Sequence, residues 1–206
     1  DLASFTDNGN GVTFSNCSHC VTSSGTEPYT FKTFGNWNDN TNWFGSIMPG
    51  EGKDVKVTAA AIIPNNYLAH VGNITIQEGG SLTISNGGQL IHSNAGVVAT
   101  VEKSITGHSG NDNGGWYFIA SPLTESFTPT AGNGFLTTTY DLYFYDEPTH
   151  YWRNYKPSNN SLSPNFSIDP QKGYLYANSS GTTLSMTGTL RPSNESVTIN
   201  NLSYTS

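Results

Sequence analysis

The reactive side chains of this chain lie far apart and follow none of the spacings that enzyme catalysis requires. The sequence contains no Gly-x-Ser-x-Gly elbow, no His-Glu-x-x-His and no phosphate-binding Gly-x-x-x-x-Gly-Lys. Its five histidines are scattered, at positions 19, 70, 92, 108 and 150. Asp146 and Glu147 are adjacent, but neighbouring side chains of a strand point to opposite sides, which does not suit the paired acids of a glycosidase. We therefore expect no enzymatic activity.

The two cysteines form a single Cys-Ser-His-Cys at positions 17 to 20. A four-thiolate zinc site needs a second cysteine pair, which the chain lacks, and no βαβ pattern supports a redox motif. We expect a local disulfide between Cys17 and Cys20, as in exported proteins. A partial metal site that includes His19 is the alternative.

One loop has the composition of a calcium site. Asn111, Asp112 and Asn113 lie in the glycine-rich run 107–115. Carboxylate and amide oxygens are the ligands that Ca²⁺ prefers, so calcium is the one cofactor for which the sequence offers ligands. A linker between two domains is the alternative interpretation of the same loop.

Two aromatic pairs could form a stacking surface for a sugar or a peptide. Trp37 and Trp43 flank an asparagine-rich segment and would share one side of an extended chain. As an alternative, these two rings cap the open end of the repeat that follows. Tyr151 and Trp152 precede Arg153, a combination suited to ligand stacking. Alternation along that strand predicts that Trp152 is buried and that Tyr151 is exposed.

The elements that position these residues are predicted to be strands. The 206 residues include 22 Gly and 10 Pro, only 11% are charged, and no segment keeps the period of a helix for long. Residues 65–96 form a repeat of eight-residue units, NNYLAHVG, NITIQEGG, SLTISNGG and QLIHSNAG. Within the units apolar residues alternate, as in strands with one buried face, and each Gly or Gly-Gly supplies positive φ at a corner.

Two architectures fit this repeat. The strands could form an antiparallel meander with two-residue turns, or a β-solenoid in which about three units complete one coil. We favour the solenoid, because the polar corner always follows the same inward-facing pair, as stacked coils require.

The predicted fold class is all-β, with a short β-solenoid or meander followed by an aromatic-rich β-sandwich. Residues 1–35 read as turn-rich strands from the end of a preceding module, 36–110 as the repeat domain, and 115–206 as the sandwich. The chain begins without Met and ends in the strand-like segment 196–204. We expect a piece of a longer protein, with the sandwich cut short at its C-terminus.

The charge of the chain excludes two classes of partner. The net charge is -7, and the eight Lys and Arg residues are spread thinly along the sequence. Nucleic acids and anionic membranes are bound by clustered cations, so neither is expected as a partner. No apolar run reaches the length of a membrane span, so membrane insertion is not expected either.

Several motifs follow one another in order between residues 36 and 206. They are Trp43 with Pro49-Gly50, the Asn73-to-Ile84 repeat, the run from Gly115 to Pro122, the 142–147 strand with Trp152, and residues 173–178 with Gly188-Thr189-Leu190. Together they resemble the β-rich region that precedes the C-terminal sorting domain in large secreted or surface-attached proteins of the Bacteroidetes. Many proteins of that family are labelled adhesins or hemagglutinins.

This resemblance implies export by a type IX secretion route and an extracellular or cell-surface location. It implies a non-catalytic adhesion or spacer module within a larger surface protein. The implied partners are neighbouring domains of that protein and a host matrix protein or a glycan. A carbohydrate-binding module attached to a secreted enzyme is the alternative. The family has no catalytic motif that maps onto this chain.

Overall fold

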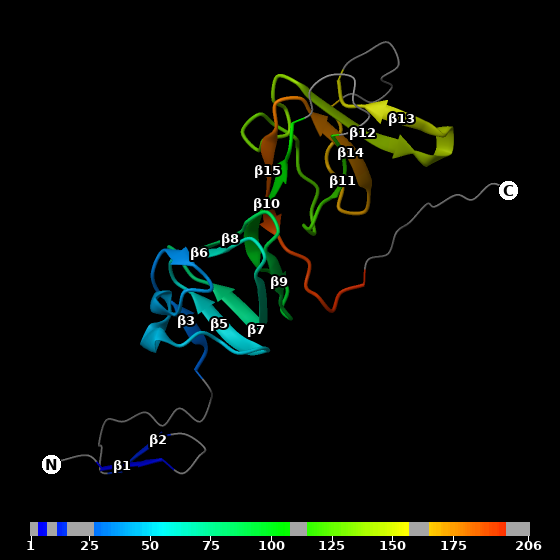
Figure 1. The fold of residues 1–206 in the computed structure, drawn as a ribbon. Helices are drawn as coiled ribbons and strands as arrows, with labels where there is room; N and C mark the ends of the chain where they lie inside the picture. The colour runs from blue at the N-terminus through cyan, green and yellow to red at the C-terminus, as the bar shows by residue number, and fades with distance from the viewer. Residues whose placement is uncertain (1–3, 8–11, 16–26, 108–114, 157–164, 197–206) are drawn as a thin grey trace.

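The computed structural model describes residues 4–7, 12–15, 27–107, 115–156 and 165–196. These residues form strands joined by turns, which confirms the predicted all-β class (Figure 1). The helical segments in this part of the chain are single 3-10 turns, at Asn40–Asn42 (η1), Phe44–Ser46 (η2) and Glu147–Thr149 (η3). None of its helices has the length and apolar character needed to cross a bilayer.

A short antiparallel hairpin comes first in the chain. Strands β1 (Ser4–Asp7) and β2 (Val12–Ser15) pair with Phe5 opposite Phe14, and they form a sheet of their own among the described strands. The remaining strands start at Tyr29 and form a parallel part followed by an antiparallel part (Figure 1).

The parallel part is a β-solenoid with two sheets. One sheet has the order β3 (Tyr29–Phe31), β5 (Lys53–Val57), β7 (Leu68–Ile76) and β9 (Gln89–Ile91). The other contains, in order, β4 (Gly35–Asn36), β6 (Ala60–Ile63), β8 (Ser81–Ile84) and β10 (Val98–Ile105). Each coil of the chain contributes one strand to each sheet.

Strand direction decides between the two architectures that the repeat allowed. Leu68 pairs with Gln89 and Ile63 with Ile84, both in parallel ladders and both 21 residues apart. A meander would pair these strands antiparallel, so the repeat forms a solenoid. Strand β7 is long because it runs through two of the eight-residue units, and Gly72 lies inside it.

The glycine pairs of the repeat have two separate roles. Gly79 and Gly87, the first of each pair, have φ of +82° and +80°, which favours glycine at these turns. Gly80 and Gly88, the second of each pair, press against the coil beneath: an added Cβ would lie 2.4 Å from the Val57 carbonyl oxygen or 2.7 Å from that of Ile63. Positive φ therefore does not explain the second glycine. That position stays free of a side chain so that the coils can stack.

The interior of the solenoid is aliphatic. Alternate residues of its strands point inward and are almost fully buried, among them Val55, Val57, Ala61, Ile63, Ala69, Val71, Ile74 and Leu82. Small and β-branched side chains of this kind pack well between two closely spaced sheets. The period-2 pattern seen in the sequence is thus the inward face of each coil.

The antiparallel part is built on one four-stranded sheet. Its order is β11 (Trp116–Ala120), β14 (Gly173–Asn178), β12 (Tyr140–Asp146) and β13 (Tyr151–Asn154). The inner face carries Tyr174 and Tyr176, both buried, and Phe135 packs edge-on against Tyr176 at 5.8 Å. This core is aromatic where the solenoid core is aliphatic.

The segment around residues 133–135 covers the inner face of this sheet. The Tyr176 hydroxyl donates to the Phe135 carbonyl at 3.1 Å, while the Ser185 N–H donates to the Asn133 carbonyl at 3.0 Å. The segment therefore lies between β14 and β15 (Thr182–Thr189). Strand β15 in turn pairs antiparallel with β10 over its whole length.

Strand pairing crosses the domain limits that the sequence suggested. β3 precedes residue 36 and β15 follows residue 115, yet both belong to the sheets of the solenoid. The reason is the open edge that a short solenoid would leave at β10, whose unpaired backbone groups β15 satisfies. The expected strand over 196–204 lies outside the described residues, apart from Ser196.

Candidate binding surface

Trp37 and Trp43 are core residues. They are 1% and 0% exposed, their ring centroids lie 4.8 Å apart edge to face, and the Trp43 Nε1–H donates to the Trp37 carbonyl at 2.8 Å. The Lys32 N–H donates to the Asn42 carbonyl at 2.8 Å, so this segment lies along the edge strand β3. No ligand can reach the two rings, and the predicted sugar platform is absent here. Capping of the repeat, the alternative interpretation, fits their position.

The predicted calcium loop at Asn111, Asp112 and Asn113 lies outside the described residues, as do Cys17 and Cys20. The disulfide and the calcium site therefore stay predictions. In the part of the chain that the structure describes, no three His, Cys, Asp or Glu side chains gather closely enough to hold a metal ion.

Tyr151 and Trp152 are both accessible, at 66% and 47% exposure. The expected burial of Trp152 is wrong, because Arg153 takes the inward position next to it. The Arg153 Nε donates to Asp146 Oδ2 at 2.9 Å, and its Nη2 donates to the Thr149 hydroxyl at 2.8 Å. The Arg153 side chain points inward because its ion pair with Asp146 satisfies its charge. Its neighbour Trp152 therefore points outward.

The outer face of the four-stranded sheet carries a continuous group of large apolar side chains. In one row Phe118 lies opposite Leu175, and Leu175 lies opposite Tyr143. In a neighbouring row Tyr145 lies opposite Trp152. We call this group the aromatic face, and it consists of Trp116, Phe118, Leu175, Tyr143, Tyr145 and Trp152.

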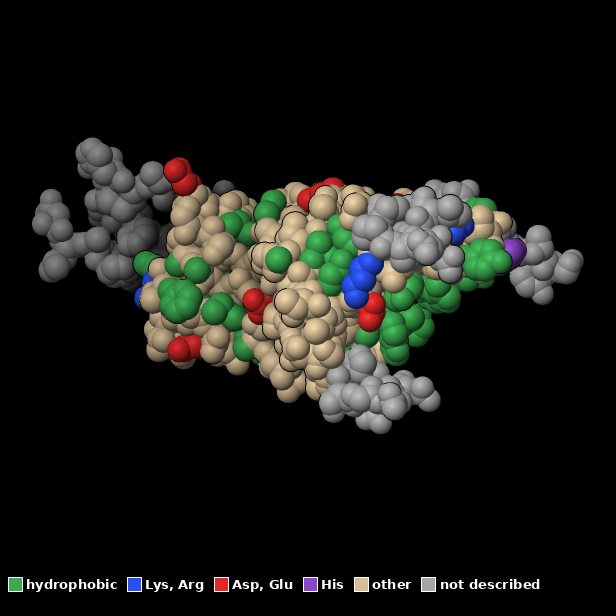
Figure 2. All heavy atoms as spheres, turned by 90° about the horizontal axis from the view of Figure 1, so that it is seen from above, with side chains coloured by type: hydrophobic (Ala, Val, Ile, Leu, Met, Phe, Trp, Pro, Cys, Tyr) green, Lys and Arg blue, Asp and Glu red, His purple; other side chains and the backbone are tan. Residues whose placement is uncertain are grey.

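The rings of the aromatic face contact one another and remain open to solvent. The centroids of Trp116 and Tyr143 lie 5.9 Å apart, and those of Tyr145 and Trp152 lie 5.3 Å apart. Phe118 is 82% exposed, the highest value among the large hydrophobic residues whose burial the structure describes. Hydrophobic side chains gather at the end of the molecule that carries this sheet (Figure 2). Exposed apolar groups of this extent mark interaction sites.

A hollow interrupts the aromatic face at Gly173. This glycine lies opposite Ala120 of β11, and a Cβ added to it would meet no atom within 4 Å. The same two residues line a cavity of about 480 Å³ that also involves Lys172 and Arg191. Flat rings, a gap without side chains and nearby cations thus adjoin each other at this end of the sheet.

Two phenol groups of this sheet, those of Tyr143 and Tyr174, have pKa values above the usual range. Burial raises the pKa of Tyr143, the negative charge of Asp141 adds to the rise, and a hydrogen bond from Asn154 opposes it. Burial also raises the pKa of Tyr174, on the inner face, to about 12. Tyr143 therefore offers a protonated hydroxyl beside the Trp116 ring over the whole physiological pH range.

The solenoid also exposes large hydrophobic residues, but in a different arrangement. Phe34 lies between β3 and β4, while Phe44, Ile47 and Met48 lie between β4 and β5. Leu68 and Val98 lie on separate strands. Single exposed apolar residues of this kind are normal for a protein surface. The aromatic face differs because cross-strand register places its members side by side.

Sequence reasoning found Trp152 and missed Trp116, Phe118, Tyr143 and Tyr145. Their strands were expected, and strict alternation was visible in the run Tyr143, Phe144, Tyr145. Both alternating sets are aromatic, however, so the pattern did not distinguish the inner face from the outer one. The available signal was the number of aromatic residues in these strands, which is larger than the inner face of a single four-stranded sheet can bury.

Comparison with protein-family models, with curated proteins and with solved structures finds no match for this chain. Its class is therefore defined by its own architecture, a parallel β-solenoid joined to an antiparallel sheet with an exposed aromatic face. Aromatic side chains bind sugars and peptides by stacking and apolar contact, without covalent chemistry.

Proposed function

We propose that this chain is a non-catalytic adhesion module of a larger extracellular or surface-attached bacterial protein. The observation that supports this most strongly is the aromatic face, a solvent-exposed surface of stacking groups on a rigid sheet. The resemblance to the β-rich region of Bacteroidetes adhesins and hemagglutinins favours the same function. In this proposal the solenoid acts as a spacer, and neighbouring domains of the parent protein continue from it.

A binding function agrees with the way the carboxylates of the hairpin are used. Asp146 accepts hydrogen bonds from Thr149 and Arg153, and these bonds keep its pKa below the usual range. An acid held ionised in an ion pair is poorly suited to donate a proton in catalysis. Asp146 therefore has a structural role in the hairpin, and the lack of catalytic motifs in the sequence supports our proposal that the chain has no intrinsic enzymatic activity.

The second candidate function is a carbohydrate-binding module that serves an attached enzyme. The gap at Gly173 favours it, because a sugar ring can stack on Trp152 or Phe118 while its hydroxyl groups face the cavity near Lys172 and Arg191. An adhesin and a carbohydrate-binding module would use the same surface. The ligand separates them: a host matrix protein or host glycan for the first, and the polymer degraded by the enzyme for the second.

The test is a binding array of glycans and matrix proteins, run once with calcium and once with chelator. We expect saturable binding that the double variant Phe118→Ala/Trp152→Ala weakens by at least about tenfold, since stacking anchors dominate such surfaces. The matched control is Phe44→Ala, which removes an equally exposed ring from the solenoid connection. Equal binding by wild type and double variant would refute the assignment to the aromatic face. Sensitivity to chelator would add the 111–113 loop to the site.

A further inference from the structure

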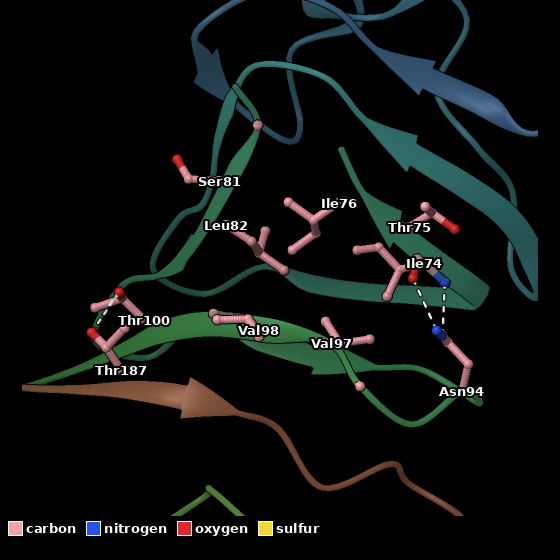
Figure 3. A pocket seen from close by; sticks show the side chains of 13 residues that line it. Ile74, Thr75, Ile76, Ser81, Leu82, Asn94, Val97, Val98, Thr100 and Thr187 are labelled. Carbon is pink, nitrogen blue, oxygen red and sulfur yellow. Dashed lines mark hydrogen bonds between the residues drawn. The ribbon is translucent and has the colours of Figure 1, made fainter. Parts of the chain in front are cut away.

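A second surface lies where the last coil of the solenoid is shorter than the one before it. Strand β9 pairs with β7 only at residues 68–70, and its continuation turns away at Ala95 and Gly96 towards β10. The end of β7 therefore projects beyond the last coil. A cavity of about 460 Å³ opens beneath it (Figure 3).

The edge of β7 that faces this cavity can be followed residue by residue. The Gln77 N–H donates to the Val57 carbonyl, so odd-numbered residues of this stretch bond towards β5 and even-numbered ones towards β9. On the β9 side, the Gly72 carbonyl accepts from the Ser93 N–H at 2.9 Å. The next pair of groups belongs to Ile74.

Asn94 satisfies Ile74 with its side chain. The Ile74 N–H donates to Asn94 Oδ1 at 2.8 Å, and Asn94 Nδ2 donates to the Ile74 carbonyl at 3.0 Å (Figure 3). The carboxamide takes the place of the backbone that a longer β9 would supply. The next groups along the same edge are the N–H and C=O of Ile76, and no described residue bonds to them from this side. A pair of strand hydrogen-bonding groups is thus open.

The walls of the cavity are apolar and uncharged. The side chains of Ile74, Ile76, Leu82 and Val97 point into it (Figure 3), and Val98 at its rim is 52% exposed. Its remaining lining consists of glycine, alanine, threonine, serine and asparagine residues, none of which carries a charge. The site therefore combines an open strand edge with an apolar hollow that is large enough for a side chain.

We propose that this groove, the β7 edge groove, accepts an extended and uncharged peptide segment of a partner protein. The peptide backbone pairs with the N–H and C=O of Ile76 and continues the ladder that Ser93 and Asn94 begin. One apolar side chain of the peptide enters the hollow between Ile76, Leu82 and Val98. Backbone pairing supplies affinity and the hollow supplies selectivity, as in other cases where a peptide adds a strand to a sheet. This surface is separate from the aromatic face and does not depend on its function.

The test uses the full chain and the synthetic peptide acetyl-Thr-Val-Thr-Val-Thr-Val-amide, titrated by isothermal calorimetry or NMR. We expect saturable binding with shifts at Ile76, Asn94 and Val98. A peptide N-methylated at every residue cannot donate a backbone hydrogen bond from either edge, and we expect it to bind at least about tenfold more weakly, a loss of about 1.4 kcal/mol.

Two variants test whether the peptide binds in the β7 edge groove. Val98→Asp puts a charge at the rim of the groove and is expected to weaken binding at least about tenfold. Leu68→Asp is the matched control, because Leu68 is also a half-exposed strand residue of the solenoid but lies outside the groove. Undiminished binding to Val98→Asp, or no binding of the peptide at millimolar concentration, would overturn the proposal. Dimerisation of the chain that Val98→Asp abolishes would also overturn it, since a second copy would then occupy the groove.

Discussion

The solenoid and the four-stranded sheet differ in how far the apolar faces of their strands are buried. Both sheets of the solenoid turn their aliphatic residues inward, and the large exposed residues of this part lie in connections or singly on strands. The antiparallel sheet has aromatic residues on both faces, and within the described residues only its inner face is covered. Burial of aliphatic side chains stabilises the solenoid and explains its arrangement. The exposed aromatic side chains of the sheet add no such burial, so stability does not explain them. The comparison therefore supports our proposal that the exposed face of the sheet is the adhesive surface of the chain.

The largest effect is expected from Trp43→Ala in the solenoid. The indole is fully buried between Trp37 and Phe31, so its removal leaves a cavity and an unpaired Trp37 carbonyl. We expect a loss of about 3–5 kcal/mol in the free energy of unfolding, measured by urea denaturation. The neighbouring Phe44→Ala removes an exposed ring and should change stability by less than about 0.5 kcal/mol. Similar losses of unfolding free energy for both variants would contradict the role of Trp43 as a buried residue that caps the repeat.

Two glycine substitutions sharpen the comparison at the level of the backbone. Gly80→Ala would push a Cβ against the Val57 carbonyl of the coil beneath, and we expect a loss of about 1–3 kcal/mol in unfolding free energy. Gly173→Ala adds a methyl group where nothing lies within 4 Å, so stability should be unchanged or slightly higher. Thermal unfolding of both proteins checks this. A tolerated Gly80→Ala would mean that the coils are not stacked so closely.

A pH dependence is expected from the last coil. Burial lowers the pKa of His92, and a hydrogen bond with the Asn94 carbonyl opposes this shift. The unfolded chain takes up a proton near pH 6.5, whereas the folded chain does so only at lower pH. The contribution of His92 is therefore complete above about pH 6.5 and is lost as the pH falls through the folded pKa. Melting temperatures between pH 8 and pH 5 should show this decline.

Two variants, each lacking one histidine, test this prediction. His92→Gln should flatten the decline on the acid side, although its melting temperature at pH 8 is expected to be lower because it disturbs a buried corner. His150→Asn, at the exposed residue that follows η3, removes a histidine outside the last coil and serves as the control. An unchanged slope in His92→Gln would show that other groups cause the acid sensitivity.

The smallest effect is expected on the aromatic face. Phe118→Ser removes a ring that is 82% exposed, so the free energy of unfolding should change by less than about 0.5 kcal/mol. Urea denaturation measures this directly. A loss of 2 kcal/mol or more would mean that the ring is covered in the folded chain and that the face is part of a core.

Sequence alone predicted the strands and the repeat and favoured a solenoid over a meander, because the alternation of apolar residues and the recurring glycines have direct local causes. It could not predict that β15 returns to pair with β10, since nothing local in residues 182–189 specifies a partner so far away in the chain. Of the residues predicted for a binding surface, Trp152 is exposed on the aromatic face, whereas Trp37 and Trp43 are buried, as the alternative capping interpretation required. Composition marks a tryptophan as useful for stacking, but only packing decides whether it is reachable.

The position of Trp152 shows the limit of alternation as a guide. The pattern Tyr151, Trp152, Arg153 favours an inward tryptophan on hydrophobicity alone. The ion pair with Asp146, seven residues away across the hairpin, makes the inward arginine acceptable instead. A register decided by such a pair can be recognised only when both partners are placed in space.

The most direct measurement is acrylamide quenching of tryptophan fluorescence, with and without a ligand identified on the array. The four tryptophans divide equally between the two regions, with Trp37 and Trp43 buried in the solenoid and Trp116 and Trp152 exposed on the sheet. We predict that the wild type is quenched, that ligand protects it, and that Trp116→Phe/Trp152→Phe is hardly quenched and shows no protection. Strong quenching of the double variant, or ligand binding that leaves the quenching of the wild type unchanged, would contradict the assignment of binding to the aromatic face.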